Sequence, residues 1–214
     1  MYSTGMHITW HGQYTIKIQT NDTTLVIDPY SPETGLAPFR SKADVVALTN
    51  PGDPTMSHLA GIQGEPHIIN SPGEYSLRGL TLHAIGWHDG TDSERSLHLW
   101  TVEQMTILHL GALNREPSDT EHQQLEKTNI DVLFLPVGNG NGLTTKQALH
   151  IVTTVEPRIV IPVHYALPHL KEKLDPVNQF AEEMGVDPRH HESKIILKHN
   201  KLPQDEMTVV LLAP

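Results

Sequence analysis

The sequence contains no cysteine. This absence removes disulfides, thiolate metal ligands and cysteine nucleophiles together, and it gives no sign of an oxidising compartment. No stretch reaches the ~18 consecutive apolar residues of a membrane-spanning helix. The opening residues, MYSTGMHITW, have neither the basic nor the apolar region of a secretion signal. We therefore expect a soluble, cytoplasmic protein that does not associate with a membrane.

Positive charge is also scarce, with 15 Lys and Arg residues against 25 Asp and Glu residues and a formal net charge of -10. No run of Lys or Arg interrupts this excess, so a nucleic-acid backbone would be repelled. Nucleic acid is thus not an expected partner, which leaves an unidentified small molecule or protein. The length of 214 residues suits one domain, which we take to cover residues 1–214.

The first half of the chain is rich in predicted β-strands. Short stretches of alternating or continuous apolar residues are separated by tight turns such as Asn21-Asp22. These stretches predict strands at residues 7–10, 14–19, 24–28, 45–49, 67–70, 80–86, 96–102 and 105–110.

The second half adds helices, two of which are announced by capping boxes. Ser118 is followed three residues later by Glu121, and Thr144 by Gln147. In this motif each side chain satisfies a backbone N–H that the first helical turn leaves without a partner. Both pairs therefore predict helix starts.

A third helix is predicted between Asp175 and Gly185. Asp175 would be its N-cap, Pro176 its first helical residue, and Gly185 its end. Apolar strands are expected around these helices at residues 131–137, 158–165, 194–199 and 207–213. Strands followed by strand-helix-strand units predict a layered α/β domain in which two sheets pack together with helices outside.

Three groups of segments occur in an order that carries a family resemblance. They are WHGQYTIKI with LVIDPY, then INSPGEYSLRGLTLHAIGWHD, then ILHLGAL with DVLFLPVG and PRIVIPVHY. Together they resemble the metallo-β-lactamase superfamily, and within it the small stand-alone zinc-dependent hydrolases, over a region from His7 to about Leu212. The resemblance implies an α/β fold, the four-layer αββα sandwich, with a one- or two-metal hydrolytic site along one edge. Relatives of this kind act on lactams, esters, thioesters, lactones and phosphodiesters, and the fold does not select among them.

The resemblance also places the metal ligands, and here the sequence departs from it. The family's first cluster, His-x-His-x-Asp-His, follows the strand that is ADVVALT in this chain, so that its four slots fall on Asn50, Gly52, Pro54 and Thr55. Catalytic zinc takes imidazole and carboxylate ligands and keeps one position open for water. Two of these residues have no ligating side chain and the other two are poor zinc ligands. The carboxylate that usually bridges two metals falls on Ala112.

Other family positions are retained. The carboxylate of the Ile-Asp-Pro turn is Asp28, which we expect to support the loop, while the middle and late histidines are His88 and His164. The two histidines are either hydrogen-bonded cleft residues or metal ligands. The candidates for a catalytic cleft are Asp28, His88, Asp89 and His164.

Asp53 and Pro54 suggest that the first ligand loop has been rebuilt. Asp before Pro predicts an N-cap and a first helical residue, hence a short helix over residues 53–62. That helix would direct His58 away from the site. The alternative is that Asp53 or His58 has become a metal ligand.

Two main hypotheses follow. In the first, the dinuclear site is largely lost, no cofactor is bound, and the chain is an inactive or non-classical homologue with a binding or regulatory role. In the second, one zinc, manganese or iron is held by His88 and His164 with Asp53, His58 or Asp89, and hydrolyses an ester, lactone or phosphodiester. A third hypothesis, metal-free His-Asp acid-base catalysis, lacks an evident nucleophile. The sequence also has no Gly-x-Ser-x-Gly motif.

Overall fold

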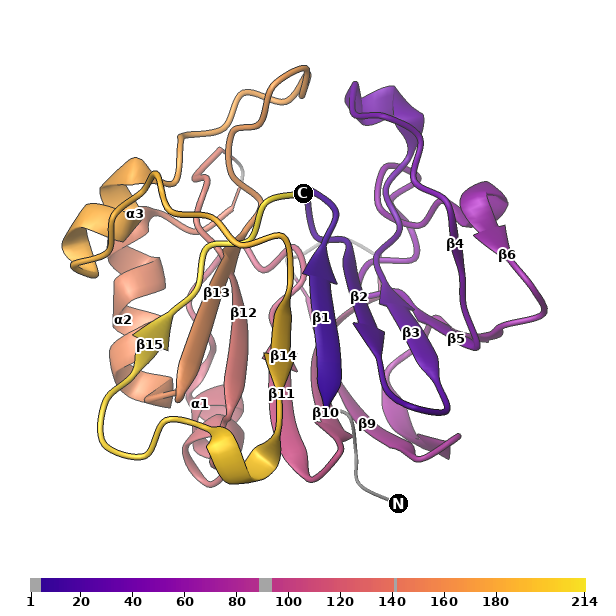
Figure 1. Cartoon of the computed structure of the whole chain (residues 1–214), viewed down its shortest axis with the longest axis horizontal. Coiled ribbons are helices and arrows are strands. Elements are labelled where there is room, and N and C mark those ends of the chain that lie inside the picture. The colour runs from indigo at the N-terminus through magenta and orange to yellow at the C-terminus, as the bar shows by residue number, and fades with distance from the viewer. Residues whose placement is uncertain (1–4, 89–93, 141) are drawn as a thin grey trace.

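The structure is a computed structural model that describes residues 5–88, 94–140 and 142–214. Two β-sheets pack face to face (Figure 1). The first has the order β14 (Ile195–Leu197), β1 (Met6–Trp10), β2 (Ile16–Gln19), β3 (Thr24–Ile27), β5 (Val45–Ala47) and β7 (His67–Ile69). The second has the order β15 (Thr208–Val209), β13 (Ile159–Val163), β12 (Val132–Pro136), β11 (Met105–His109), β10 (Arg95–Val102), β9 (Leu80–Trp87) and β8 (Gly73–Leu77).

The strand directions bring several strand ends to one edge of the sandwich. In the first sheet β3, β5 and β7 are parallel, and in the second β11, β12, β13 and β15 are parallel. The loops that follow the carboxyl ends of parallel strands meet at one edge, which is where open α/β sheets commonly bind ligands.

The core lies between the two sheets because alternate residues of each strand point inward. In β1 the buried residues Met6, Ile8 and Trp10 alternate with half-buried ones, as the period of a half-buried strand requires. They join Trp100 and Met105 of the second sheet in one hydrophobic cluster. Strands β12 and β13 are buried along their whole length, since helices cover their outer face.

Three α-helices follow β11 in the chain: α1 (Asp119–Glu126), α2 (Thr145–Val155) and α3 (Asn178–Glu183). Helices α1 and α3 both contact α2 and lie outside the second sheet (Figure 1). Both predicted capping boxes are confirmed, at Ser118 for α1 and at Thr144 for α2. None of the helices in the described ranges is long and apolar enough to span a bilayer.

The predicted start of the third helix was wrong. Helix α3 begins at Asn178, and its N-cap Val177 makes no side-chain capping bond. The carboxylate of Asp175 instead accepts a hydrogen bond from the Asn139 amide at 3.2 Å, because a loop from another part of the chain lies beside it. The predicted end was right: Gly185 has a φ of 71° and donates its N–H to the Glu182 carbonyl.

The predicted helix over residues 53–62 was also wrong. The Asp53 carboxylate accepts the backbone N–H and hydroxyl of Thr55, at 2.8 and 2.6 Å, and so caps a turn. Only residues Leu59–Gly61 form a helix, the 3-10 turn η2, and another 3-10 turn, η1, covers Pro32–Thr34.

The outer face of the first sheet is covered without an α-helix in the described ranges. Val26 and Val46 on this face pack with Tyr30, Phe39 and Leu48 in a second hydrophobic cluster. The short pair β4 (Ser41–Lys42) and β6 (Ile62–Gln63) lies in the same region. The expected α/β class is confirmed, but the fourth layer of the sandwich is made of loops, 3-10 turns and this small sheet.

Candidate functional site

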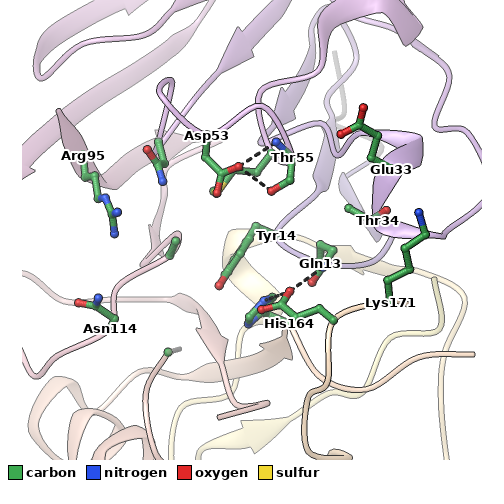
Figure 2. Close-up of a pocket in the computed structure, with 15 residues that line it drawn as sticks. Gln13, Tyr14, Glu33, Thr34, Asp53, Thr55, Arg95, Asn114, His164 and Lys171 are labelled. Carbon is green, nitrogen blue, oxygen red and sulfur yellow. Dashed lines mark hydrogen bonds and ion pairs between the residues drawn. The ribbon is translucent and has the colours of Figure 1, made fainter. Parts of the chain in front are cut away.

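A cavity of about 460 Å³ lies at the edge where the strand ends meet (Figure 2). Its walls come from the loops that follow β1, β3, β5, β11, β12 and β13, together with the first residue of β10. The fold thus gathers six separate loops around one space, in the region where the family resemblance places a metal site.

His109 is buried beneath the cavity and holds the loop that carries Tyr14. Its Nδ1 accepts the Gly111 backbone N–H at 2.9 Å, so Nε2 is the protonated nitrogen and donates to the Tyr14 carbonyl at 3.1 Å. Burial lowers the pKa of His109 to about 4, which keeps the imidazole neutral. The loop after β1 is thereby fixed to the second sheet.

Tyr14 and His164 form a stacked pair in the cavity lining. Their ring centroids are 4.1 Å apart and the rings are nearly parallel, at 15°. Burial raises the pKa of the Tyr14 hydroxyl well above its ordinary value, and the charges of Glu172, Asp28 and Asp53 raise it further, against an opposing effect of Arg95. The phenol therefore stays protonated and can donate a hydrogen bond.

His164 is 3% exposed and already has an internal partner. Its Nε2 donates to Glu172 Oε2 at 3.2 Å, and the Gln13 amide donates to the same oxygen at 3.1 Å (Figure 2). The hydrogen bond from His164 lowers the pKa of Glu172, with Gln13 adding to the effect, so the carboxylate is charged. His164 Nδ1 is buried without a hydrogen-bond partner among the described residues.

Asp28 lies behind the cavity wall and does not line it. Its carboxylate accepts both hydrogen-bond donors of Thr49, the residue just before Asn50. Burial raises the pKa of Asp28 to about 7, although the bonds from Thr49 lower it in part. Asp28 thus holds the segment that follows β5 in place and does not itself contribute to the cavity lining.

Three of the five degenerate ligand slots line the cavity. Asn50 and Thr55 do so on the loop after β5, and Ala112 does so on the loop after β11, whereas Gly52 and Pro54 lie outside the lining. Asn50 is 5% exposed, and its Oδ1 has no hydrogen-bond partner among the described residues.

Of the other residues predicted from the sequence, some line the cavity and others lie away from it. Asp53 lines the cavity beside Thr55. His58 lies just before η2, with its backbone N–H bonded to the Pro29 carbonyl, and His88 is exposed at the end of β9; neither lines the cavity. Asp89 lies outside the described residues. The structure therefore places only His164 of the two retained histidines at the cavity.

Several lining residues were not predicted from the sequence. Arg95, the first residue of β10, stacks over the Trp87 ring with its guanidinium carbon 5.2 Å from the ring centroid. Lys171 and Glu172 belong to the loop after β13, and Glu33 belongs to η1. No local pattern marks these charges, because tertiary contacts bring them to the cavity.

Among the described residues, the side chains around the cavity form no ready set of metal ligands. A catalytic zinc needs about three protein ligands and an open position. Within the part of the chain that the structure describes, no group of three or more His, Asp or Glu side chains is arranged to hold a metal ion. At the cavity itself, His164 Nε2 is bonded to Glu172 and Ala112 has no donor atom.

Comparison with known proteins identifies the family. A family model described as the β-lactamase superfamily domain matches residues 7–164. A relative from Lysinibacillus sphaericus (strain C3-41), named UPF0173 metal-dependent hydrolase, is 25% identical over 197 residues, which cover 75% of this chain and 85% of that protein.

Solved structures of similar fold point to the same family. A Thermotoga maritima protein, described as a candidate zinc-dependent hydrolase of the metallo-β-lactamase superfamily, has a TM-score of 0.77 at 26% identity, over 98% of this chain and 100% of that one. A metallo hydrolase from Ignicoccus hospitalis KIN4/I shares the fold, with a TM-score of 0.67 at 18% identity over 91% of this chain and 99% of that one. The strand order, the position of the cavity and these matches together show that the chain belongs to the metallo-β-lactamase superfamily.

Proposed function

We propose that this chain is a non-classical member of the superfamily that binds a small polar molecule in the cavity without a metal, in a binding or regulatory role. One observation carries the proposal: Asn50, Thr55 and Ala112 line the cavity at positions where the resemblance expects metal ligands. A neutral amide, a hydroxyl and a methyl group cannot neutralise a divalent cation, whereas they can contact an organic ligand.

The environment of His164 supports the same proposal. A metal ligand needs a nitrogen lone pair that faces the metal. His164 Nε2 donates a hydrogen bond to Glu172, and Nδ1, which carries the lone pair, is buried. Metal binding at Nε2 would require Glu172 to move and the imidazole to change tautomer. As a pair, His164 and Glu172 instead form a fixed polar wall.

The alternative is a hydrolase with one rearranged metal held by His88 and His164 with Asp53, His58 or Asp89. The observation that favours it is the name metal-dependent hydrolase carried by relatives of this chain. Of these residues, His164 and Asp53 line the cavity, so a further ligand would have to reach it from elsewhere.

Metal content decides between the two. The protein is purified without chelator or nickel, incubated with zinc, manganese or iron, desalted, and measured by inductively coupled plasma mass spectrometry. The Lysinibacillus sphaericus relative, treated identically, serves as the control. We expect far less than one metal per chain here, unchanged in His88→Ala and His164→Ala. About one metal per chain, lost in His164→Ala, would refute the metal-free function and favour the hydrolase.

A further inference from the structure

Hydrogen-bond donors gather at one end of the cavity. The Arg95 guanidinium, the Asn114 amide and the Tyr14 hydroxyl point toward the same space in Figure 2. In the described part of the chain, the Tyr14 hydroxyl and the Asn114 amide have no hydrogen-bond partner. A guanidinium with neutral donors beside it is the arrangement that recognises a carboxylate, because two parallel N–H groups match its two oxygens.

Acceptors lie next to these donors. Thr55 occupies Asp53 Oδ1 with two hydrogen bonds, which orients the carboxylate and leaves Oδ2 without a partner in the described ranges. The side-chain oxygen of Asn50 is buried and unsatisfied. Asp53 Oδ2 is therefore the acceptor that is available to a ligand with hydrogen-bond donors.

The two kinds of group do not neutralise each other. Arg95, Asp53 and Tyr14 all line the cavity, and the two charges act on the pKa of the Tyr14 hydroxyl in opposite directions. Asp53 nevertheless forms no ion pair with any basic side chain that the structure describes. The cavity lining therefore includes a positive and a negative side chain that do not pair with each other.

The remaining lining is compatible with an apolar substituent. Met56 is 2% exposed and lines the cavity together with the Tyr14 ring and the Ala112 methyl group. A volume of about 460 Å³ is within the range of sites for small organic ligands.

We propose that the cavity binds a small zwitterion of the α-amino-acid type. Its carboxylate is held by Arg95, Tyr14 and Asn114, and its ammonium group by Asp53. This assignment rests on the proposed metal-free binding function and names its ligand class. A simple anion would be repelled by Asp53, and a simple amine would leave the donors around Arg95 unused.

A thermal-shift screen of the metal-free protein against the twenty standard amino acids provides the first test. The strongest hit is then compared, by isothermal titration calorimetry, with its analogue lacking the amino group and its analogue lacking the carboxylate. We expect at least one amino acid to bind, and each analogue to bind at least about tenfold more weakly, since a charged hydrogen-bond partner is lost. No hit, or an analogue that binds equally well, would overturn the assignment.

Matched variants locate the site. Arg95→Met and Asp53→Asn are expected to weaken binding at least about tenfold. Arg189→Met and Asp22→Asn remove the same charges from exposed positions and should leave affinity unchanged. Circular dichroism and melting temperature establish that each variant is folded. Wild-type affinity in folded Arg95→Met and Asp53→Asn would refute the site.

Metal analysis of the same preparations separates this inference from the proposed function. Metal-free protein that binds an amino acid supports both. Metal-free protein that binds none overturns only the ligand class. Protein with about one metal per chain overturns the proposed function, whatever it does with amino acids.

Discussion

Thr49 donates both its backbone N–H and its hydroxyl to the carboxylate of Asp28, at 2.7 and 2.6 Å. Both residues are buried, and Asp28 has a φ of 46°, so the two bonds fix an unusual backbone conformation at the ends of β3 and β5. The loop that carries Asn50 and Asp53 begins at the next residue. The geometry of the cavity wall therefore depends on a carboxylate that never touches the cavity.

Asp28 should make the protein less stable as pH rises. Its pKa is about 7 in the folded state against an ordinary value of 3.8. The folded state therefore binds the proton more tightly, and the stabilisation present below about pH 4 is lost progressively up to about pH 7. In Asp28→Asn this loss disappears, so the variant gains stability relative to wild type across that range.

Urea unfolding at several pH values between about 4 and 8 measures the effect. The exposed Asp22→Asn variant is the control. Parallel stability curves for wild type and Asp28→Asn would show that the Asp28 carboxyl does not titrate between these values.

The buried histidines should act with the opposite sign. Burial lowers the pKa of His98 to about 3 and that of His109 to about 4, below the ordinary 6.5. The stabilisation is complete above about pH 6.5 and is lost as pH falls toward these values, by about 1 kcal/mol per pH unit for each residue. In His98→Phe, the free energy of unfolding should fall less steeply below pH 6.5, by about 1 kcal/mol per pH unit. The exposed His199→Phe should leave this slope unchanged. An unchanged slope in His98→Phe would contradict the prediction.

The two capping boxes illustrate what the sequence could predict. Ser118 with Glu121, and Thr144 with Gln147, satisfy backbone groups within three residues of themselves, so the pattern contains all the partners. Asp175 and Asp53 carry equally good local signals, yet a distant Asn139 and a neighbouring Thr55 compete for their carboxylates. Local motifs predict structure only where no other partner, near or distant in sequence, competes for the same side chain.

The residues of the cavity also divide into those that the sequence could predict and those that it could not. Of the positions that family spacing marked, Asn50, Thr55, Ala112 and His164 line the cavity, whereas Gly52, Pro54 and His88 do not. Arg95 and Glu172 reach the cavity from the start of β10 and from the loop after β13. Their roles depend on which loops lie side by side, and single-sequence periodicity holds no information about that.

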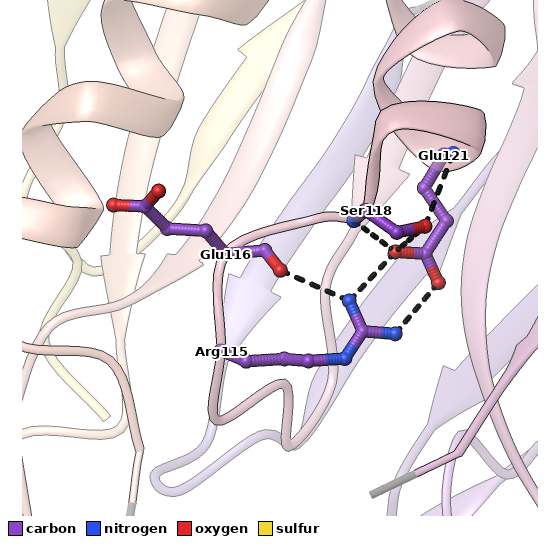
Figure 3. A network of polar contacts seen from close by, with 4 residues as sticks. All are labelled: Arg115, Glu116, Ser118 and Glu121. Carbon is purple, nitrogen blue, oxygen red and sulfur yellow. Dashed lines mark hydrogen bonds and ion pairs between the residues drawn. The ribbon is translucent and has the colours of Figure 1, made fainter.

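Glu121 should be the most sensitive residue in the first turn of α1. Its carboxylate caps the helix through the Ser118 backbone N–H and receives two bonds from the Arg115 guanidinium, at 2.7 and 2.9 Å (Figure 3). Glu121→Ala loses the capping bond and removes the carboxylate partner of Arg115, so we expect a cost of about 2 kcal/mol in urea unfolding. Asp119→Ala, in the same turn but outside this network, should cost about 0.5 kcal/mol or less.

A double-mutant cycle with Arg115→Met isolates the ion pair. Additive losses in Glu121→Ala and Arg115→Met would show that the pair contributes nothing beyond the cap.

Gly138 tests how tightly the late-histidine loop is packed. A Cβ at this position would overlap the carbonyl oxygen of His164 and lie 2.8 Å from Tyr165 Cα, and the Gly138 N–H is itself bonded to that carbonyl at 2.9 Å. Backbone atoms cannot move aside as a flexible side chain can, so Gly138→Ala should cost about 3 kcal/mol of unfolding free energy.

Gly185→Ala separates steric overlap from backbone strain. Gly185 has a φ of 71° with no atom within 4 Å of the added Cβ, so only the strain of the left-handed conformation remains and the expected cost is about 1 kcal/mol. If overlap with His164 dominates, Gly138→Ala must also displace the His164 ring from Tyr14 and weaken ligand binding, whereas Gly185→Ala must not. Equal stability losses and equal affinities in the two variants would mean that the loop after β13 yields, and that the Tyr14–His164 stack is not held by this contact.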